Sequence, residues 1–175
     1  MTFIFLQALA LQISEIFQGT VFRDPAVEVE TDEGAFIQPR IFVGALPPKR
    51  RLDQQKEDYP FIVIRGPDGE DKEGESDVSG EIICGIYTAG DEKAGTTDIH
   101  NIIDRVRLGI LQKRIVDNRF ELQTPITWTT GADEERNQPH PFYIGRVSGT
   151  WKYVRFDHQE SADEEVVVYG AGYGN

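Results

Sequence analysis

In the stretch "YPFIVIRGPDGEDKEGESDVSGEIICGIYT", Tyr59 to Thr88, two apolar runs lie on either side of a polar, glycine-rich connection. The first run, Tyr59 to Arg65, holds aromatic and β-branched residues without polar interruption, as a central strand covered on both faces would. The second run, Ser76 to Gly90, alternates, and one of its faces carries Val78, Ile82, Cys84 and Ile86. Together they predict an antiparallel hairpin with a connection of eleven or twelve residues, against about two to five residues in common hairpins.

That connection, "RGPDGEDKEGESD", is strongly acidic. Its carboxylates are Asp68, Glu70, Asp71, Glu73, Glu75 and Asp77. A calcium loop of the EF-hand type starting at Asp68 would place Lys72 at a ligand position and Glu73 where the loop requires glycine. The spacing therefore argues against a calcium site. Hairpin loops of this length are usually functional or disordered, so we expect a long acidic hairpin loop that contacts a partner or solvent.

Two helices are expected outside this hairpin. Apolar residues recur at steps of three and four from Leu6 to Phe17, and Gly19 is placed to end that helix. A second helix is predicted over Thr97 to Ile115, with Thr96 or Thr97 as its N-cap. Its apolar stripe consists of Ile99, Ile102, Ile103, Val106, Ile110 and Leu111.

Further strands are predicted on both sides of the hairpin. "RIFVGAL" (Arg40 to Leu46) is a strand candidate, and "AVEVE" (Ala26 to Glu30) is a shorter one. "RFELQTPITWTT" (Arg119 to Thr130) places Phe120, Leu122, Ile126 and Trp128 on one face, and its Pro125 indicates an edge or a bulge. "FYIGRVSGTWKYVRF" (Phe142 to Phe156) is a long strand in which Gly145, Ser148 and Gly149 favour a bulge or a close approach.

These elements predict an α+β fold, with an antiparallel or mixed β-sheet of about four to five strands and two α-helices packed on one face. Residues 1–156 are expected to form a single domain. Residues 157–175 are acidic and then glycine-rich, which predicts a flexible C-terminal tail. The alternative is that "VVVYG" within it adds as a strand to the edge of a neighbouring subunit.

Charge and composition restrict the function. The 30 Asp and Glu against 18 Lys and Arg give a formal net charge of −12, a field that repels nucleic acid and anionic membranes. The apolar N-terminal segment lacks a basic region before it and is too short to span a bilayer, so neither a cleaved signal nor membrane attachment is expected. Cys84 is the only cysteine, which excludes a disulfide framework and indicates folding in the cytoplasm.

No catalytic constellation is visible in the sequence. His100, His140 and His158 are scattered without metal-ligand spacing, and Cys84 lies in an apolar β pattern typical of a core residue. We therefore predict no cofactor, no metal and no catalytic residue. Two classes of function remain: an assembly protein that acts through its surfaces, which the missing motifs favour, and a small hydrolase that uses acidic residues.

Several stretches, taken in order, resemble the tail terminator proteins of long-tailed bacteriophages, also called tail-completion or head-to-tail joining proteins. They are "FVGALPPKR", "YPFIVIR", the acidic connection, "GEIICGIYT", "DIHNIIDRVRLGIL", "RFELQTPITW" and "QPHPFYIGRVSGTW". They extend from Phe42 to Trp151, over half of the chain. Each is short and mostly structural, and the resemblance rests on their order and spacing. Residues 21–38 and those after Phe156 match nothing in the family pattern.

The resemblance implies a structural virion protein without cofactor or catalysis. Such proteins form a hexameric ring on the last ring of tail-tube protein, stop its polymerisation and present the surface that joins the head completion or connector protein. DNA passes through the ring without tight binding. The implied location is the head-proximal end of the phage tail, after folding in the bacterial cytoplasm. The nearest alternative is another head-to-tail connector or a tail-tube component.

In such a ring, the acidic residues Asp68, Glu70, Asp71, Glu73, Glu75 and Asp77 are candidates for lining the lumen or contacting the tail tube. The alternative for this segment is a solvated hairpin tip. The one basic cluster, Lys49, Arg50 and Arg51, is a candidate for pairing with carboxylates of the neighbouring subunit, or else a solvated turn. Trp128 and Trp151 are interpreted as sheet residues first and as interface anchors second.

Overall fold

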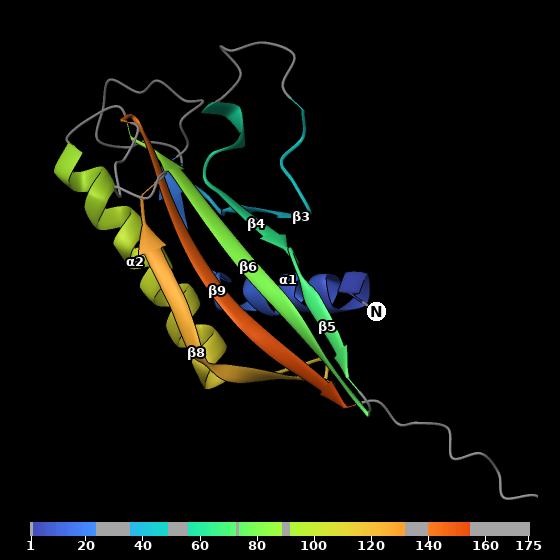
Figure 1. Cartoon of the computed structure of the whole chain (residues 1–175). Helices are drawn as coiled ribbons and strands as arrows, with labels where there is room; N and C mark the ends of the chain where they lie inside the picture. Colours follow the sequence, from blue (N-terminus) through green and yellow to red (C-terminus); the bar gives the residue numbers. More distant parts are fainter. Residues whose placement is uncertain are drawn as a thin grey trace, which may run out of the picture.

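Two long antiparallel strands, β6 (Glu75–Tyr87) and β9 (Phe142–Val154), form the centre of the fold (Figure 1). They pair in one unbroken register, from Glu75 opposite Val154 to Tyr87 opposite Phe142. The computed structural model describes residues 2–23, 36–48, 56–72, 74–88, 92–131 and 140–154. Within these ranges the chain has an α+β fold, with two helices and a curled, mixed sheet (Figure 1).

The main sheet has seven strands, more than the four or five expected. Its order is β3 (Arg40–Val43), β4 (Phe61–Arg65), β6, β9, β8 (Phe120–Thr130) and β7 (Ile115–Val116), and β5 (Gly69–Lys72) also pairs with β6. The β3–β4 pair is parallel and the other pairs are antiparallel, so the sheet is mixed. A separate antiparallel ribbon consists of β1 (Phe22–Arg23) and β2 (Phe36–Ile37).

The prediction of a long hairpin loop is wrong, because much of the acidic connection is strand. β5 pairs with β6 beyond the point where β4 ends, and the turn between β5 and β6 contains Gly74 with a φ of +75°. The Ser76 hydroxyl donates to Asp71 Oδ1 over 2.6 Å, and the Ser79 hydroxyl donates to the Asp68 carbonyl over 2.6 Å. These side-chain hydrogen bonds hold together two strand segments that have little apolar alternation to mark them.

The two predicted helices are present, the second at shifted bounds. α1 (Thr2–Ile16) covers most of the first prediction. α2 (Glu92–Gln112) begins and ends earlier than the predicted span of 97–115. The Thr97 hydroxyl donates to the carbonyl oxygen of Lys93, four residues earlier, over 2.9 Å. Thr97 therefore lies inside the helix, and its prediction as an N-cap is wrong.

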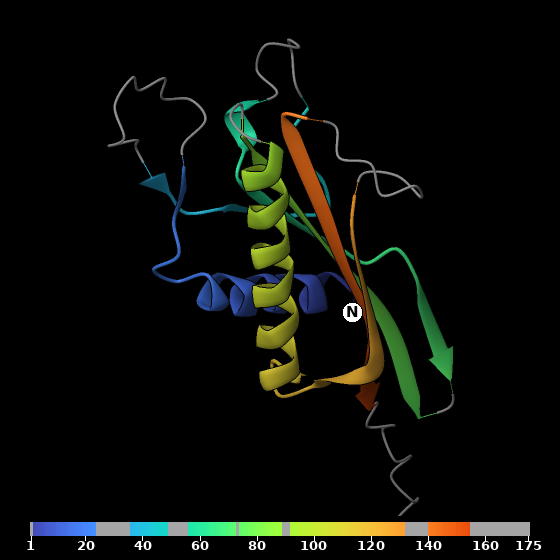
Figure 2. The same ribbon diagram turned by 90° about the vertical axis from the view of Figure 1, so that its left-hand side faces the viewer.

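Both helices pack on the same face of the sheet, as expected (Figure 2). Their apolar faces and the inward residues of β4, β6, β8 and β9 form one core, which includes Phe5, Leu9, Ile13, Ile82, Cys84, Ile99, Ile103, Val106, Val147 and Trp151. Trp151 is buried, which confirms it as a sheet residue. Leu111 is predicted to lie in the buried stripe of α2, but it is 37% exposed because it lies near the end of that helix.

The two helices meet where each of them ends. The Gln12 amide donates to the Lys113 carbonyl over 2.6 Å, and Arg105 Nε donates to the Ile16 carbonyl over 3.0 Å. Each helix thus supplies a donor to carbonyl groups at the end of the other, where no partner exists within the helix itself. Gly109 permits this approach, since a Cβ there would lie 2.5 Å from Ile16 Cδ1.

The long edge strand β8 contains the irregularity that its proline predicts. Its pairing with β9 shifts between Gln123 and Thr127, which confirms a bulge around Pro125. The shift adds two residues to β8, so Trp128 still lies opposite the buried Val147 and faces the helices. Trp128 is 46% exposed, and the Arg107 guanidinium lies 5.0 Å from the centre of its ring.

Several predictions fall on other parts of the chain. The strand candidate 26–30, the basic cluster Lys49, Arg50 and Arg51, Glu73, His158 and the segment 157–175 all lie outside the described residues. The last predicted residues of the final strand, 155–156, do so as well.

We predict that Gly145→Ala lowers the free energy of unfolding by about 1–3 kcal/mol, because overpacking strains a filled core. The added Cβ would lie 2.6 Å from Ile103 Cγ1, on the face of β9 that α2 covers. Urea unfolding measures the change. The control is Thr150→Ala at an exposed position of the same strand, which should stay within about 0.5 kcal/mol of the parent. Equal midpoints for both variants would contradict the close helix–sheet contact.

Candidate functional site

The sheet has a second face, turned away from α1 and α2, which we call the outer face (Figure 2). Because side chains alternate along a strand, the residues of β6 that do not enter the core point to this face. The outer face of β6 carries Glu75, Asp77, Ser79, Glu81, Ile83 and Tyr87. The outer face is therefore acidic at the end near β5 and apolar at the opposite end.

The apolar end is an aromatic cluster. The Tyr59 ring lies 4.8 Å from Phe61 and 5.2 Å from Phe142, and Phe142 lies 5.3 Å from Tyr87. Gly85 makes room for it, because a Cβ there would lie 2.4 Å from the Phe61 ring. Burial, with a smaller contribution from the neighbouring Asp58 carboxylate, raises the pKa of Tyr59 to about 12. This cluster packs the rim of the outer face and offers no ionised group.

At the centre of the outer face, one carboxylate is held between two arginines. Glu81 on β6 has only 9% of its side chain exposed. Its Oε2 accepts from Nε of Arg65 on β4, and its Oε1 lies 2.9 Å from Nε of Arg146 on β9. Three adjacent strands therefore each contribute one charged side chain to the same contact.

This arrangement leaves an excess of one positive charge on the face of an acidic protein. About half of each arginine is exposed, 47% for Arg65 and 42% for Arg146, while the carboxylate beneath is nearly covered. The shared carboxylate fixes the direction of both guanidinium groups, which are planar and carry several donors. Chemically, such a fixed pair of guanidinium groups is suited to receiving an anion such as a carboxylate or a phosphate.

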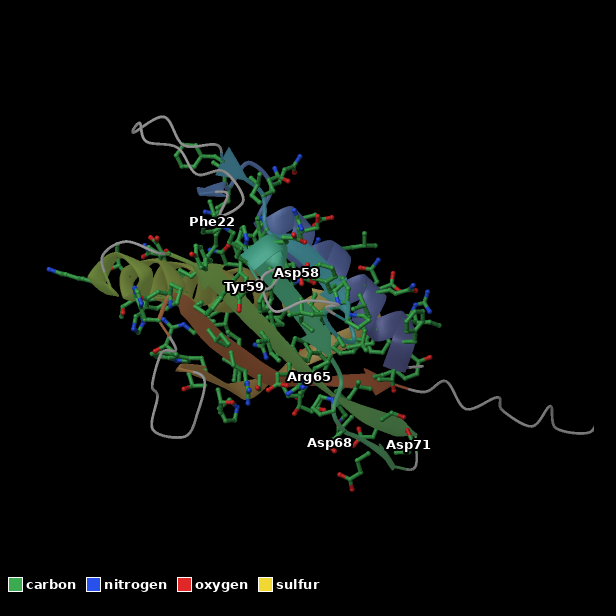
Figure 3. All side chains as sticks on the ribbon, turned by 90° about the horizontal axis from the view of Figure 1, so that it is seen from above. Phe22, Asp58, Tyr59, Arg65, Asp68 and Asp71 are labelled. Carbon is green, nitrogen blue, oxygen red and sulfur yellow. The ribbon has the colours of Figure 1, made fainter. Side chains whose placement is uncertain are left out.

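The acidic residues singled out from the sequence come together at one end of the sheet. Asp68, Glu70 and Asp71 lie on or beside β5, and Glu75 and Asp77 lie on the first part of β6. We call this unit, β5 with residues 75–78, the acidic hairpin. Figure 3 shows Arg65, Asp68 and Asp71 following one another toward its tip. Whether it faces a lumen, a tail tube or solvent stays a prediction.

The acidic hairpin places like charges opposite each other. Glu70 pairs directly with Asp77 across the two strands, on the outer face. Asp77 lies opposite Lys152 of β9, and the Lys152 ammonium forms an ion pair with Glu75. Like charges at directly opposed positions destabilise a strand pair. Lys152 lies beside both carboxylates of β6, while Glu70 and Asp77 remain directly opposed across the hairpin.

His100, His140 and Cys84, which lie in the described part of the chain, have separate surroundings. Cys84 is completely buried, and burial raises the pKa of its thiol, which confirms it as a core residue. The His100 ring nitrogen lies 3.5 Å from the Thr130 hydroxyl, and the His140 ring packs edge-on against Tyr143. Across the described ranges, no group of three or more His, Cys, Asp or Glu side chains is arranged to hold a metal ion.

Two other surface features are separate from the contact between Arg65, Glu81 and Arg146. A cavity of about 280 Å³ is lined mostly by apolar residues, including Phe22, Phe36 and Tyr87, together with Asp98 and Asn101 of α2. Burial raises the pKa of the Asp98 carboxyl. α1 exposes large apolar side chains on its solvent side: Phe3, Ile4 and Leu11. Neither helix in the described residues is both long and apolar enough to cross a membrane.

The arginine pair was not found from the sequence. Alternation alone placed Glu81 on the polar face of its strand, but its partners are 16 and 65 positions away in the chain. The one indication in the sequence was the predicted hairpin itself. In the structure its two strands, β4 and β6, place Arg65 directly opposite Glu81. The basic cluster that the sequence did indicate, Lys49 to Arg51, lies outside the described residues.

Comparison with known proteins gives no relative for this chain: no family model matches it, and no curated protein sequence matches it.

We predict that Arg65→Gln and Arg146→Gln each lower the free energy of unfolding by less than about 1 kcal/mol, because the remaining arginine still pairs with Glu81. In the double variant, the free energy of unfolding should fall by about 1–2 kcal/mol more than the sum of the two single losses. The reason is that the double variant leaves a covered carboxylate without a cation. Adding Glu81→Gln to the double variant should then restore stability. Urea unfolding of the four proteins checks this, and simple additivity would mean that the three side chains do not act as a unit.

Proposed function

We propose that this protein is a structural component of a bacteriophage tail that forms a ring on the tail tube. In this role it caps the tube at its head-proximal end, stops tube polymerisation and provides the surface to which the head completion or connector protein joins. The ring is hexameric, and DNA passes through it without tight binding. The function is mechanical and requires no cofactor.

The observation that carries this proposal is how the stretches that resemble tail terminators are arranged. They supply parts of β3, β4, β6, α2, β8 and β9, which form one continuous sheet with a helix packed on it. The resemblance itself depends on their order in the sequence and not on their contacts. The proposal therefore rests on the resemblance of these stretches in sequence, because a shared fold alone does not imply a shared function.

The charge of the chain is consistent with a DNA conduit. Six copies at −12 each give a ring of about −72 formal charges, and a lumen of that sign repels phosphate so that DNA slides through it. The acidic hairpin extends away from both helices, and β5 pairs only with β6 along its length (Figures 1 and 2). It is the part of the fold best placed to reach a lumen or a partner.

A ring also needs two different surfaces that fit each other. Candidates are the exposed apolar side of α1, with Phe3, Ile4 and Leu11, and the cluster Lys49, Arg50 and Arg51. Large apolar side chains exposed on one side of a helix are typical of interaction sites. Basic residues in an otherwise acidic chain can pair with carboxylates of a neighbour.

A tube-polymerisation assay tests the proposed function. Tail-tube protein is polymerised with and without the purified chain, and tube lengths are measured by electron microscopy. We expect shorter tubes in its presence, with the chain sedimenting together with the tubes. Unchanged tube lengths with the chain left in the supernatant would refute the proposal, whereas binding without any effect on length would indicate another connector or a tube component.

Neutralising the opposed carboxylates of the acidic hairpin should impair assembly without lowering the stability of the fold. Glu70→Gln with Asp77→Asn removes a repulsive cross-strand pair, so stability should rise or stay equal, within about 0.5 kcal/mol. Capping of tubes in the same assay should fall. The matched control is Glu121→Gln, which removes an exposed carboxylate from β8. Normal capping by the double variant would show that the hairpin is only a solvated tip.

A further inference from the structure

In an acidic protein that assembles with itself, copies repel each other unless opposite charges are matched at the contact. Four other cations of the described residues each pair with a carboxylate of their own: Arg107 with Asp104, Lys113 with Glu15, Arg119 with Asp117, and Lys152 with Glu75. Arg65 and Arg146 differ from these, because the two of them share the single carboxylate of Glu81. The centre of the outer face is therefore a fixed positive site.

We propose that the Arg65–Arg146 pair of one subunit binds the acidic hairpin of a second copy, through the carboxylate of Glu70, which lies on the outer face opposite Asp77. This inference rests on the proposed ring, since it names the contact between neighbouring subunits. Glu70 is an exposed residue of β5, at the end of the sheet that extends away from the helices. Guanidinium groups held in place by Glu81 lose little freedom when they bind, which favours such a contact.

The hairpin of the same subunit cannot occupy this site. Glu70 lies opposite Asp77, which is four residues before Glu81 along β6. At about 3.3 Å per residue, the hairpin carboxylates are roughly 13 Å from Glu81 within one rigid sheet. The Glu70 carboxylate therefore does not reach the arginine pair of its own subunit, whereas a second copy can present the same carboxylate there.

The relative position of the two surfaces also agrees with a ring. The acidic hairpin and the arginine pair are different patches on the same molecule, so their contact can repeat head to tail from copy to copy, as a ring requires. When two copies associate head to tail, each of them keeps one patch unoccupied. Further copies can therefore add until a ring closes and every patch is occupied. This contact assigns the hairpin tip to the interface between copies, so any repulsion of DNA in the lumen comes from other carboxylates.

Charge reversal tests the contact. Arg146→Glu, or Glu70→Arg, should each lower the apparent association constant about 100-fold or more, because each sets like charges against each other. Native mass spectrometry and sedimentation with and without tail tubes measure the oligomer. Arg119→Glu is the matched control, because it reverses an exposed arginine that lies between β7 and β8 and pairs with Asp117 instead of Glu81. Urea unfolding of Arg146→Glu checks that the fold is intact with Arg65 still paired to Glu81.

Mixing the two reversed variants gives the decisive result. In an alternating ring, the reversed hairpin of one variant meets the reversed face of the other, and the remaining contacts have the parent charges. We expect oligomers in the equimolar mixture and monomers of each variant alone. The inference is wrong if each variant alone assembles like the parent. It is also wrong if the mixture stays monomeric while the parent forms rings on tubes. In both cases the proposed function still stands. Two further outcomes would overturn the inference. In the first, Arg146→Glu leaves self-association unchanged and weakens only the binding to short duplex DNA. In the second, the parent never associates with itself, which refutes the proposed ring as well.

Discussion

The unbroken antiparallel ladder between β6 and β9 positions every other element of the fold. Thirteen residues of β6 pair with thirteen of β9 without a register shift. Because side chains alternate, this register fixes both faces of the sheet at once. A slip of one residue would place Glu81 against α1 and α2 and move Ile82 and Cys84 to the outer face. The core and the charged site therefore depend on the same set of backbone hydrogen bonds.

The two faces of the sheet differ in their side chains: the helix side is packed as a core, and the outer side carries charged groups. On the helix side, Gly145 and Gly80 remove side-chain volume so that Ile103 and Trp151 can pack closely on the backbone. On the outer side, the same strands carry the Arg65–Glu81–Arg146 contact, in which the carboxylate is covered and the arginines are not. Covering a carboxylate is costly unless cations remain beside it. Either arginine can supply that cation, and removing both would leave the covered carboxylate of Glu81 without one.

The sequence revealed the elements that bury a periodic apolar face. The run in β4, the alternation in β6 and the stripe of α2 have such local patterns, and all three were predicted correctly in type. The first turns of α2 were missed because a glycine such as Gly95 is typical of a helix break. In the structure a Cβ at Gly95 would lie 2.2 Å from the Tyr143 ring, so glycine is required there by a contact distant in sequence.

The same limit explains the errors at the candidate site. β5 and β7 gain their strand structure from pairing with longer neighbours, and β5 carries charges that local patterns assign to a loop. The acidic residues were identified individually, but their opposition across β5 and β6 follows only from the register. The arginine pair joins three strands, and no local pattern of residues encodes it.

The proposed closure of a tail tube by a ring of this protein can be tested by imaging the tube ends. Tubes are incubated with a chain labelled at its C-terminus, and the labels at each tube end are counted. We expect label at one end of each tube only, with six copies there. Label distributed along the tube, or absent from its ends, would contradict the proposed role as a terminating ring.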